Sequence, residues 1–330
     1  MRSAGSARED GACVEPQART RMIDVLSITL PIYILIAVGF VATRFGAASP
    51  ADIRALGSFV IRFALPALLY KSLAERPFAQ ILNAQYLVVY ALATSLVFAA
   101  MYALARFLRP GDPAGDAIQA LGSSCSNSGF VGYPIALLFV GPPAAVAVAL
   151  TMIVENFLAI PLSLALAENG RHVGKKFSAV ARHLVVRLAR NPMIVAIALG
   201  AATSLAGVAL PAPLARAVDM LAMASGASAL FVVGGTLVGL EVGGVTRDAA
   251  RIVAGKQILF PLVMLVAQLL LAPALDGDLR KAMFIFASSP TLSIFPLLGR
   301  QYGQERVCAA AVLLATALSF LTMSGLLLAL

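Results

Sequence analysis

The chain has 330 residues, of which 60% are hydrophobic and only 12% are charged. Soluble domains carry roughly 25% charged residues, so this composition excludes an ordinary soluble protein and indicates a polytopic membrane protein. The formal net charge of +9 does not indicate nucleic-acid binding, because the basic residues lie in short gaps between apolar runs, where the membrane orientation rule expects them.

Enzyme and metal chemistry find no support in the residue pattern. Cys13, Cys125 and Cys308 lie far apart, and His172 and His183 both fall in one basic connector. No cysteine–histidine cluster, Ser/His/Asp set or phosphate-binding glycine loop is present. We therefore expect no enzymatic activity, no cofactor and no metal site.

The N-terminal segment differs from the rest of the chain. Residues 1–21 are polar, contain four arginines and lack the apolar core of a signal peptide. Met22 directly precedes the first apolar run, which makes it a candidate for the natural start of translation. We expect residues 1–21 to be a disordered polar tail.

Long apolar segments organise the remaining chain. A helix that spans a bilayer needs about 17–25 predominantly apolar residues. By this measure the chain contains ten spans, at 23–43, 55–73, 84–107, 116–140, 145–167, 191–209, 214–239, 250–272, 279–299 and 306–329. The expected fold class is an all-α polytopic membrane protein.

Lys and Arg are shared unevenly between alternate connectors. With the N-terminus outside, the inside connectors hold fifteen of these residues and the outside connectors hold five. Cytoplasmic connectors carry an excess of Lys and Arg, so we expect both termini outside and the basic connector 168–190 in the cytoplasm. Lys256, near the inner end of span 250–272, is expected to extend its ammonium toward the interface.

The two halves of the chain repeat one pattern. The prolines, glycines and alanines of segment 31–51 recur in segment 192–212 at an offset of 161 residues. Each half, 22–167 and 191–330, contains five spans, so the two copies must be inserted in opposite orientations. This arrangement is the inverted-repeat architecture of secondary transporters.

Two spans are interrupted by glycine, proline and small polar residues. The interruptions, 122–134 and 288–296, match each other at an offset of 162 residues. Inside hydrocarbon, an irregular backbone is tolerated only where it is buried in protein or lines a wet cavity. We expect the fourth and ninth helices to be broken and to cross near the bilayer midplane. Their half-helix N-termini favour an anion, most simply a carboxylate.

The interruptions supply the candidate site residues. The candidates for substrate binding, which offer polar groups or close backbone approach, are Ser126, Asn127, Ser128, Gly129, Ser288, Ser289 and Thr291. The candidates for the helix breaks and their crossing are Gly132, Pro134, Pro290 and Pro296. For the serines and glycines, close packing between helices is the alternative interpretation.

Glu155 and the adjacent Asn156 lie within the fifth span. An ionisable residue inside the membrane is a functional candidate by default. Two roles are open for Glu155: it titrates during transport, or it braces the broken helix through hydrogen bonds.

The motifs and their order resemble a known transporter family. The segments that carry the resemblance are 63–69 (FALPALL), 127–134 (NSGFVGYP) and Ser289-Pro-Thr291 followed by Tyr302-Gly303, with Thr322 close to the end. Between Met22 and Leu330 the chain resembles the auxin efflux carrier family, which includes plant PIN-formed carriers and bacterial malonate and other organic-anion permeases.

This resemblance implies a ten-helix fold similar to that of sodium/bile-acid symporters. In that fold, helices 1, 2, 6 and 7 form a scaffold, whereas helices 3–5 and 8–10 form a mobile domain that holds the crossed breaks. The resemblance also implies organic-anion substrates and a homodimer built through helices 2 and 7. Ser289 stands where the plant carriers have a second asparagine.

Together these features predict a multi-pass transporter of the inner membrane. The expected substrate is a small organic anion, a carboxylate such as malonate or an auxin-like acid, moved by secondary active or facilitative transport of the elevator type. One alternative is a proton- or sodium-coupled cation antiporter, and another is a membrane receptor that binds its ligand without moving it. The expected partners are the anion and the lipid bilayer, not nucleic acid.

Overall fold

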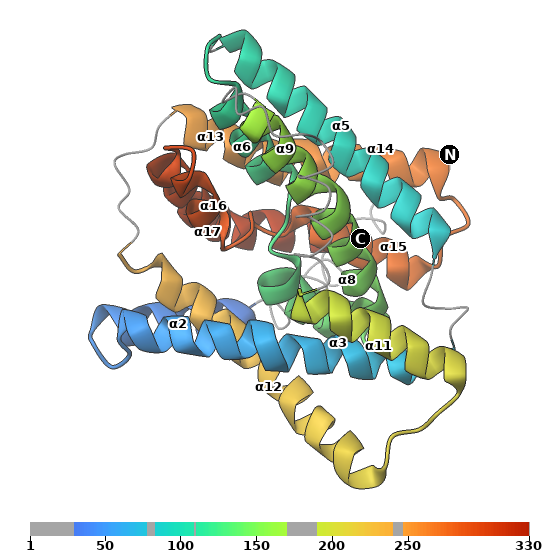
Figure 1. The fold of residues 1–330 in the computed structure, drawn as a ribbon. Coiled ribbons are helices and arrows are strands. Elements are labelled where there is room, and N and C mark those ends of the chain that lie inside the picture. The colour runs from blue at the N-terminus through green and yellow to red at the C-terminus, as the bar shows by residue number, and fades with distance from the viewer. Residues whose placement is uncertain (1–29, 78–82, 109, 170–189, 240–246, 330) are drawn as a thin grey trace, which may run out of the picture.

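The structure is a computed structural model that describes residues 30–77, 83–108, 110–169, 190–239 and 247–329 (Figure 1). The predicted tail, 1–21, and almost all of the basic connector, 168–190, lie outside the described residues. The described chain is helical apart from short turns and an isolated β-bridge between Ser126 and Thr291.

Helices fall within every predicted span. The first half contains Leu30–Arg44, α2 (Pro50–Phe59), α3 (Leu65–Ala74), α5 (Ala84–Leu108), α6 (Pro113–Ser124), α7 (Tyr133–Val140), α8 (Pro143–Val154) and α9 (Ile160–Asn169). The second half contains α11 (Pro192–Ala206), α12 (Ala212–Leu237), α13 (Arg247–Ala254), α14 (Phe260–Leu271), α15 (Gly277–Ser288), α16 (Phe295–Arg300) and α17 (Glu305–Ala329). Short π-helical turns join some neighbours: η1 (Val60–Ala64), η2 (Ser128–Gly132), η3 (Glu155–Ala159) and η4 (Gly255–Leu259).

Within the described residues, six helices are long and apolar enough to cross a membrane. They are Pro50–Ala74, Ala84–Leu108, Pro143–Asn169, Ala212–Leu237, Arg247–Leu271 and Glu305–Gly325, and shorter apolar helices lie at Leu30–Arg44, Ser128–Val140 and Pro192–Ala206. Helices of this length and composition match the thickness of the bilayer. The fold is therefore that of an all-helical, polytopic membrane protein.

Prolines determine where the spans deform. Each of the π-helical turns ends two residues before a proline, namely Pro66, Pro134, Pro161 or Pro261. A proline in a helix has no N–H to donate, and its ring collides with the carbonyl four residues earlier. A π-turn inserts an extra residue at this point and relieves the collision. Glu155 and Lys256 both lie in such turns.

The helices pack in two groups (Figure 1). In one group α3 packs against α11 and α12, and α12 also packs against α2. The other group contains α5 against α6 and α14, α6 against α9, α13 against α17, and α15 against α7 and α8. The first group corresponds to the helices expected to form the scaffold, and the second to those expected to form the mobile domain.

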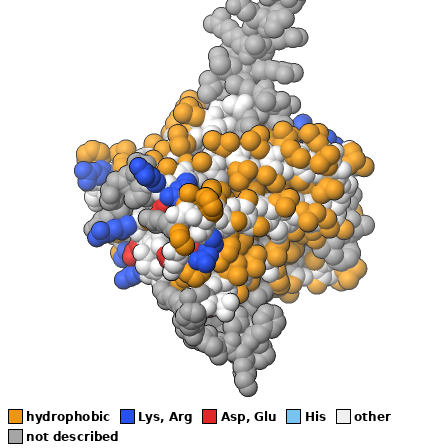
Figure 2. Space-filling model, turned by 90° about the horizontal axis from the view of Figure 1, so that it is seen from above, with side chains coloured by type: hydrophobic (Ala, Val, Ile, Leu, Met, Phe, Trp, Pro, Cys, Tyr) orange, Lys and Arg blue, Asp and Glu red, His pale blue; other side chains and the backbone are white. Residues whose placement is uncertain are grey.

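The outer surface is apolar over a wide area. Figure 2 shows hydrophobic side chains across most of the face that it presents, whereas Lys, Arg, Asp and Glu gather mainly toward one side. Large exposed side chains include Leu96 on α5 and Leu270 on α14, which are 59% and 73% exposed. An apolar surface of this extent suits contact with lipid rather than with water.

The helix Leu30–Arg44 and α12 approach each other at two glycines. A Cβ atom at Gly234 would lie 1.8 Å from the carbonyl oxygen of Ile36. A Cβ atom at Gly39 would lie 2.0 Å from the carbonyl oxygen of Phe231. Small residues allow such close backbone approach between membrane helices, so these positions fix the distance between the two helices.

We expect Gly234→Ala to lower the thermal stability of the purified protein, because overpacking costs about 1–3 kcal/mol. Gly226→Ala on the same helix is the matched control, since no neighbouring atom lies within 4 Å of a Cβ atom there. Thermal unfolding in detergent measures the difference. Equal melting temperatures for the two variants would contradict the close contact.

Candidate functional site

The first interruption follows α6. Asp112 caps this helix by accepting a hydrogen bond from the Gly115 N–H at 2.9 Å, and Pro113 occupies its first turn. After Ser124 the backbone becomes extended at Cys125. Helical structure resumes with η2, where the carbonyl of Asn127 accepts hydrogen bonds from Val131 and Gly132. The fourth span is therefore divided into two half-helices.

The second interruption meets the first directly. After α15 ends at Ser288, the backbone is extended at Ser289, and α16 begins only at Phe295 with Pro296 in its first turn. Ser126 and Thr291 form an antiparallel bridge, and the Asn127 N–H donates to the Pro290 carbonyl at 2.7 Å. The non-helical backbone of each interruption thus satisfies part of the hydrogen-bonding need of the other.

Two side chains also cross between the interruptions. The amide of Asn127 donates to the hydroxyl of Ser293 at 2.6 Å, and the hydroxyl of Thr291 donates to the Gly122 carbonyl at 2.7 Å. By contrast, Ser288 and Ser289 donate to carbonyls of their own helix, Phe284 and Ile285, respectively. The hydroxyl protons of these two candidate residues are therefore already used within α15.

The glycines of the first interruption permit close packing. A Cβ atom at Gly132 would lie 2.7 Å from both the Phe286 ring and the Ser289 hydroxyl, across the interface between the two half-helices. A Cβ atom at Gly129 would lie 2.7 Å from the terminal methyl group of Met152. All the polar candidates are buried, and the most exposed of them, Asn127, is only 5% exposed.

Glu155 accepts two hydrogen bonds from the first interruption and a third from Tyr90 on α5. Its Oε1 atom accepts from the Ser126 N–H at 3.0 Å and from the Tyr90 hydroxyl at 3.5 Å. Its Oε2 atom accepts from the Ser128 hydroxyl at 2.7 Å. The N-terminus of a helix favours an anion, and the bonds from Ser126 and Ser128 place a carboxylate of the protein itself beside the start of η2.

Asn156 belongs to a different contact. Its amide nitrogen donates to the Met152 carbonyl at 2.9 Å, and its amide oxygen accepts from Asn191 at 3.3 Å. Asn191 caps the N-terminus of α11. Asn156 follows Glu155 in the sequence, but adjacent side chains point to different faces of a helix. Asn156 thus joins the two helix groups instead of supporting the interruption.

The prediction that Lys256 extends toward the membrane interface is wrong. Its side chain is fully buried, and its ammonium donates to the Ala287 carbonyl, near the C-terminal end of α15. The ammonium also lies 4.5 Å from the centroid of the Phe260 ring. The helix already includes Arg247, so Lys256 is about 14 Å into the span at 1.5 Å per residue.

Glu155 and Lys256 place opposite charges at opposite helix ends. The acid lies at the N-terminal end of the half-helix that begins with η2, and the base lies at the C-terminal end of α15. Each charge is of the sign that stabilises the helix end beside it. The two groups also interact electrostatically, and Tyr90 stacks edge-on against Phe260 between them. Together they anchor both interruptions from the core of the second helix group.

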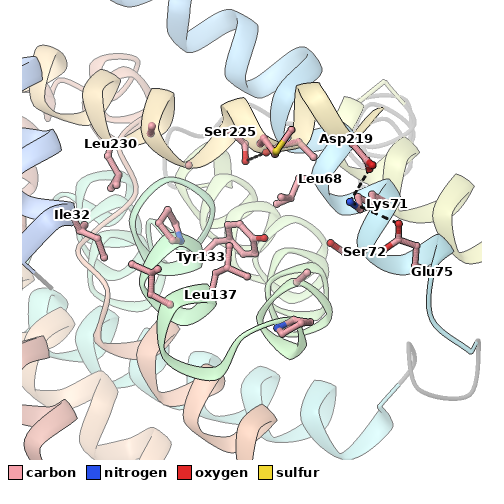
Figure 3. Close-up of a pocket in the computed structure, with 18 of the residues that line it drawn as sticks. Ile32, Leu68, Lys71, Ser72, Glu75, Tyr133, Leu137, Asp219, Ser225 and Leu230 are labelled. Atoms are coloured by element: carbon pink, nitrogen blue, oxygen red, sulfur yellow. Dashed lines mark hydrogen bonds and ion pairs between the residues drawn. The ribbon is translucent and has the colours of Figure 1, made fainter. Parts of the chain in front are cut away.

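A cavity of about 920 Å³ opens beside these interruptions (Figure 3). Its walls come from Leu30–Arg44, α3 and α12 on one side and from α7 and the start of α8 on the other. Of the candidate residues, Pro134 lines this cavity, whereas the polar candidates do not. Lys71, Ser72, Tyr133 and Asp219, which sequence reasoning did not identify, contribute its polar groups together with Glu75, Arg76 and Ser225.

Comparison with known proteins agrees with this architecture. The family model described as "Membrane transport protein" matches residues 24–327. A protein of Rhizobium meliloti (strain 1021) named "Putative malonate transporter" is 32% identical over 311 residues, which cover 93% of this chain and 96% of the relative. The chain therefore belongs to the membrane transport protein family, that of the auxin efflux carriers whose motifs it carries, and is a multi-pass membrane transporter and not an enzyme.

Proposed function

We propose that this protein moves a small organic carboxylate across the inner membrane by alternating access. The observation that carries the proposal is the direct contact between two interrupted spans, made by the Ser126–Thr291 bridge and the Asn127–Pro290 hydrogen bond. Irregular backbone at membrane depth is a feature of transporter binding sites. The name of the relative from Rhizobium meliloti makes malonate the first substrate to test.

The proposed architecture consists of two inverted repeats of five helices, 22–167 and 191–330. The recurrence of segment 31–51 at 192–212 supports this division, as does the presence of one interrupted span in each half. An inverted repeat allows one helix group to move against the other and to expose a site alternately to the two sides. We propose that α2, α3, α11 and α12, with Leu30–Arg44, stay fixed while the other group moves.

The solute would bind where the two groups face each other, beside the interruptions. Glu155 already binds the Ser126 N–H and the Ser128 hydroxyl, next to the start of the half-helix that begins with η2, so we assign it the role of a brace. Asn127 does not line the cavity, but its amide reaches the opposite interruption at Ser293 and keeps a second N–H from which a solute beside the interruptions would accept a hydrogen bond. The cavity of about 920 Å³ is large enough for a short dicarboxylate and provides its access route.

Orientation and assembly complete the proposal. The excess of Lys and Arg in alternate connectors supports both termini on the outer side. With that orientation, the ends of α3 and α12 that line the cavity would face outward, and we propose that the cavity opens to the outer side. A homodimer through helices 2 and 7 is proposed on the resemblance alone, and disulfide cross-linking between cysteines placed on α12 tests it.

Counterflow in proteoliposomes tests the function. Vesicles that contain the purified protein and are loaded with unlabelled malonate should accumulate labelled malonate, whereas protein-free vesicles should not. Binding of malonate without counterflow would favour a receptor. Neither binding nor flux for malonate and a panel of mono- and dicarboxylates would refute the proposal.

We expect Asn127→Ala to weaken malonate binding by about tenfold, because the loss of one to two hydrogen bonds costs about that much affinity. The folded yield should change little. Gln85→Ala is the matched control, because it also truncates an amide but one that bonds the Leu271 carbonyl on an exposed surface. Isothermal titration on the detergent-purified proteins measures both affinities. An unchanged affinity for Asn127→Ala would remove this residue from the site.

A further inference from the structure

The cavity of about 920 Å³ has polar groups on both of its facing walls. Lys71 and Ser72 project from α3, and Asp219 from α12, in the first helix group. Tyr133 projects from α7 in the second group (Figure 3). Most of the remaining lining is apolar, as at Leu68 and Leu137. A few polar groups in an apolar cavity are the usual means of orienting a small ligand.

Tyr133 has a hydroxyl without a partner. The residue is only 3% exposed, yet no hydrogen bond joins its hydroxyl to any residue that the structure describes. The hydroxyls of the buried Tyr86 and Tyr90 do find partners, in Thr151 and Glu155. The Tyr133 oxygen is not among the fully buried atoms that lack a partner, so it opens into the cavity that the residue lines and is available to the contents of that cavity.

Lys71 supplies a positive charge to the same cavity. Its ammonium lies 2.7 Å from Asp219 Oδ1 and 3.9 Å from Glu75 Oε1. The contact with Asp219 is short enough for a hydrogen bond, whereas the contact with Glu75 is too long for one. Because an ammonium has three N–H donors, the pairing with Asp219 fixes its position and leaves donors available.

The ion pair also separates two cavities. Lys71, Glu75 and Asp219 line both the cavity of about 920 Å³ and a second one of about 390 Å³ between α3, α11 and α12. The side chains of Lys71 and Asp219 are 35% and 40% exposed, so the pair is reached from the cavities without being fully solvated. An anion entering the larger cavity therefore meets a cation that is held in place but not enclosed.

We propose that the Lys71 ammonium and the Tyr133 hydroxyl bind one carboxylate of the transported anion, which deepens the function proposed above and rests on it. Both groups donate hydrogen bonds, and a carboxylate accepts several at once. Asp219 positions the ammonium and balances its charge when the cavity is empty. Since Lys71 and Tyr133 belong to different helix groups, a carboxylate held by both links the two groups and makes their relative movement depend on occupancy.

The test uses the full-length protein in proteoliposomes, with radiolabelled malonate as the probe and acetate as a monocarboxylate competitor. We expect Tyr133→Phe and Lys71→Gln each to weaken malonate binding by about tenfold or more, as expected for a hydrogen bond to a charged group. Lys71→Arg should recover most of the affinity lost in Lys71→Gln, because it restores the charge. Acetate should compete less strongly than malonate if the second carboxylate binds elsewhere in the cavity.

Two matched variants control for the loss of a hydroxyl and of a surface charge. Tyr102→Phe removes the hydroxyl of a tyrosine that stacks on Phe98, and Lys281→Gln removes a lysine that pairs with Asp278 at 4.0 Å; neither residue lines the cavity. Both should bind malonate as the wild type does. If Tyr133→Phe and Lys71→Gln bind malonate as tightly as the wild type does, the proposed subsite is wrong and the transport function still stands. A wild-type protein that binds no carboxylate would overturn both.

Discussion

Replacing Glu155 with alanine is expected to abolish transport and to lower stability strongly. The substitution leaves the Ser126 N–H and the Ser128 and Tyr90 hydroxyls without their common acceptor. A hydrogen bond to a charged group contributes about 1.5–3 kcal/mol, and unsatisfied buried donors add a desolvation cost. Thermal unfolding and malonate counterflow on the same preparation measure the two effects.

Glu155→Gln separates the brace from proton coupling. Glutamine retains an oxygen that accepts from Ser126, so it should restore much of the stability that alanine loses. If Glu155 is a brace, the pH profile of uptake by the glutamine variant keeps the wild-type shape at a lower rate. A profile that becomes flat would instead show that the carboxyl group carries a proton during transport. An alanine variant as stable as the wild type would contradict the brace.

Lys256→Met is the second substitution with a large expected effect. Methionine fills a similar volume, but it leaves the Ala287 carbonyl without its donor and Glu155 without a nearby positive charge. Removing one partner from a buried pair of charges typically costs about 3–5 kcal/mol, because the remaining charge stays buried and uncompensated. We expect a large fall in the melting temperature and loss of counterflow. Lys281→Met, at an exposed ion pair, is the control and should change neither.

The double variant Glu155→Gln, Lys256→Met tests whether the two residues act together. Removing both charges eliminates the uncompensated acid, so the double variant should be more stable than the sum of the single losses predicts. A thermodynamic cycle built from the four unfolding free energies measures this coupling. Strict additivity would mean that the two interruptions are anchored independently.

The positions of the spans and of their interruptions follow from local sequence. Hydropathy locates the helices because only apolar side chains are stable in hydrocarbon. The glycines and prolines of 122–134 and 288–296 predict irregular backbone because they weaken or remove helical hydrogen bonds wherever they occur. The structure accordingly leaves α-helical geometry after Ser124 and after Ser288.

The hydrogen-bond partners of individual polar side chains, by contrast, did not follow from local sequence. The sequence grouped Asn156 with Glu155, yet rotation about the helix directs Asn156 toward Asn191 in the other helix group. Ser288 and Ser289 stay predicted substrate-binding residues, but the sequence did not indicate that both hydroxyls donate within α15. A difference of one residue turns a side chain by about 100°, so adjacency in sequence does not predict a shared partner.

By itself, the sequence determined that this chain spans the membrane as a helical protein, where its helices are interrupted, and which family it resembles, because each depends on local composition and order. Only the tertiary structure decided the depth of Lys256 and the pairing of Lys71 with Asp219. It also decided that Tyr133 lines a cavity with its hydroxyl free of any described partner. These features depend on how distant helices rotate and pack against one another, and no local pattern encodes that geometry.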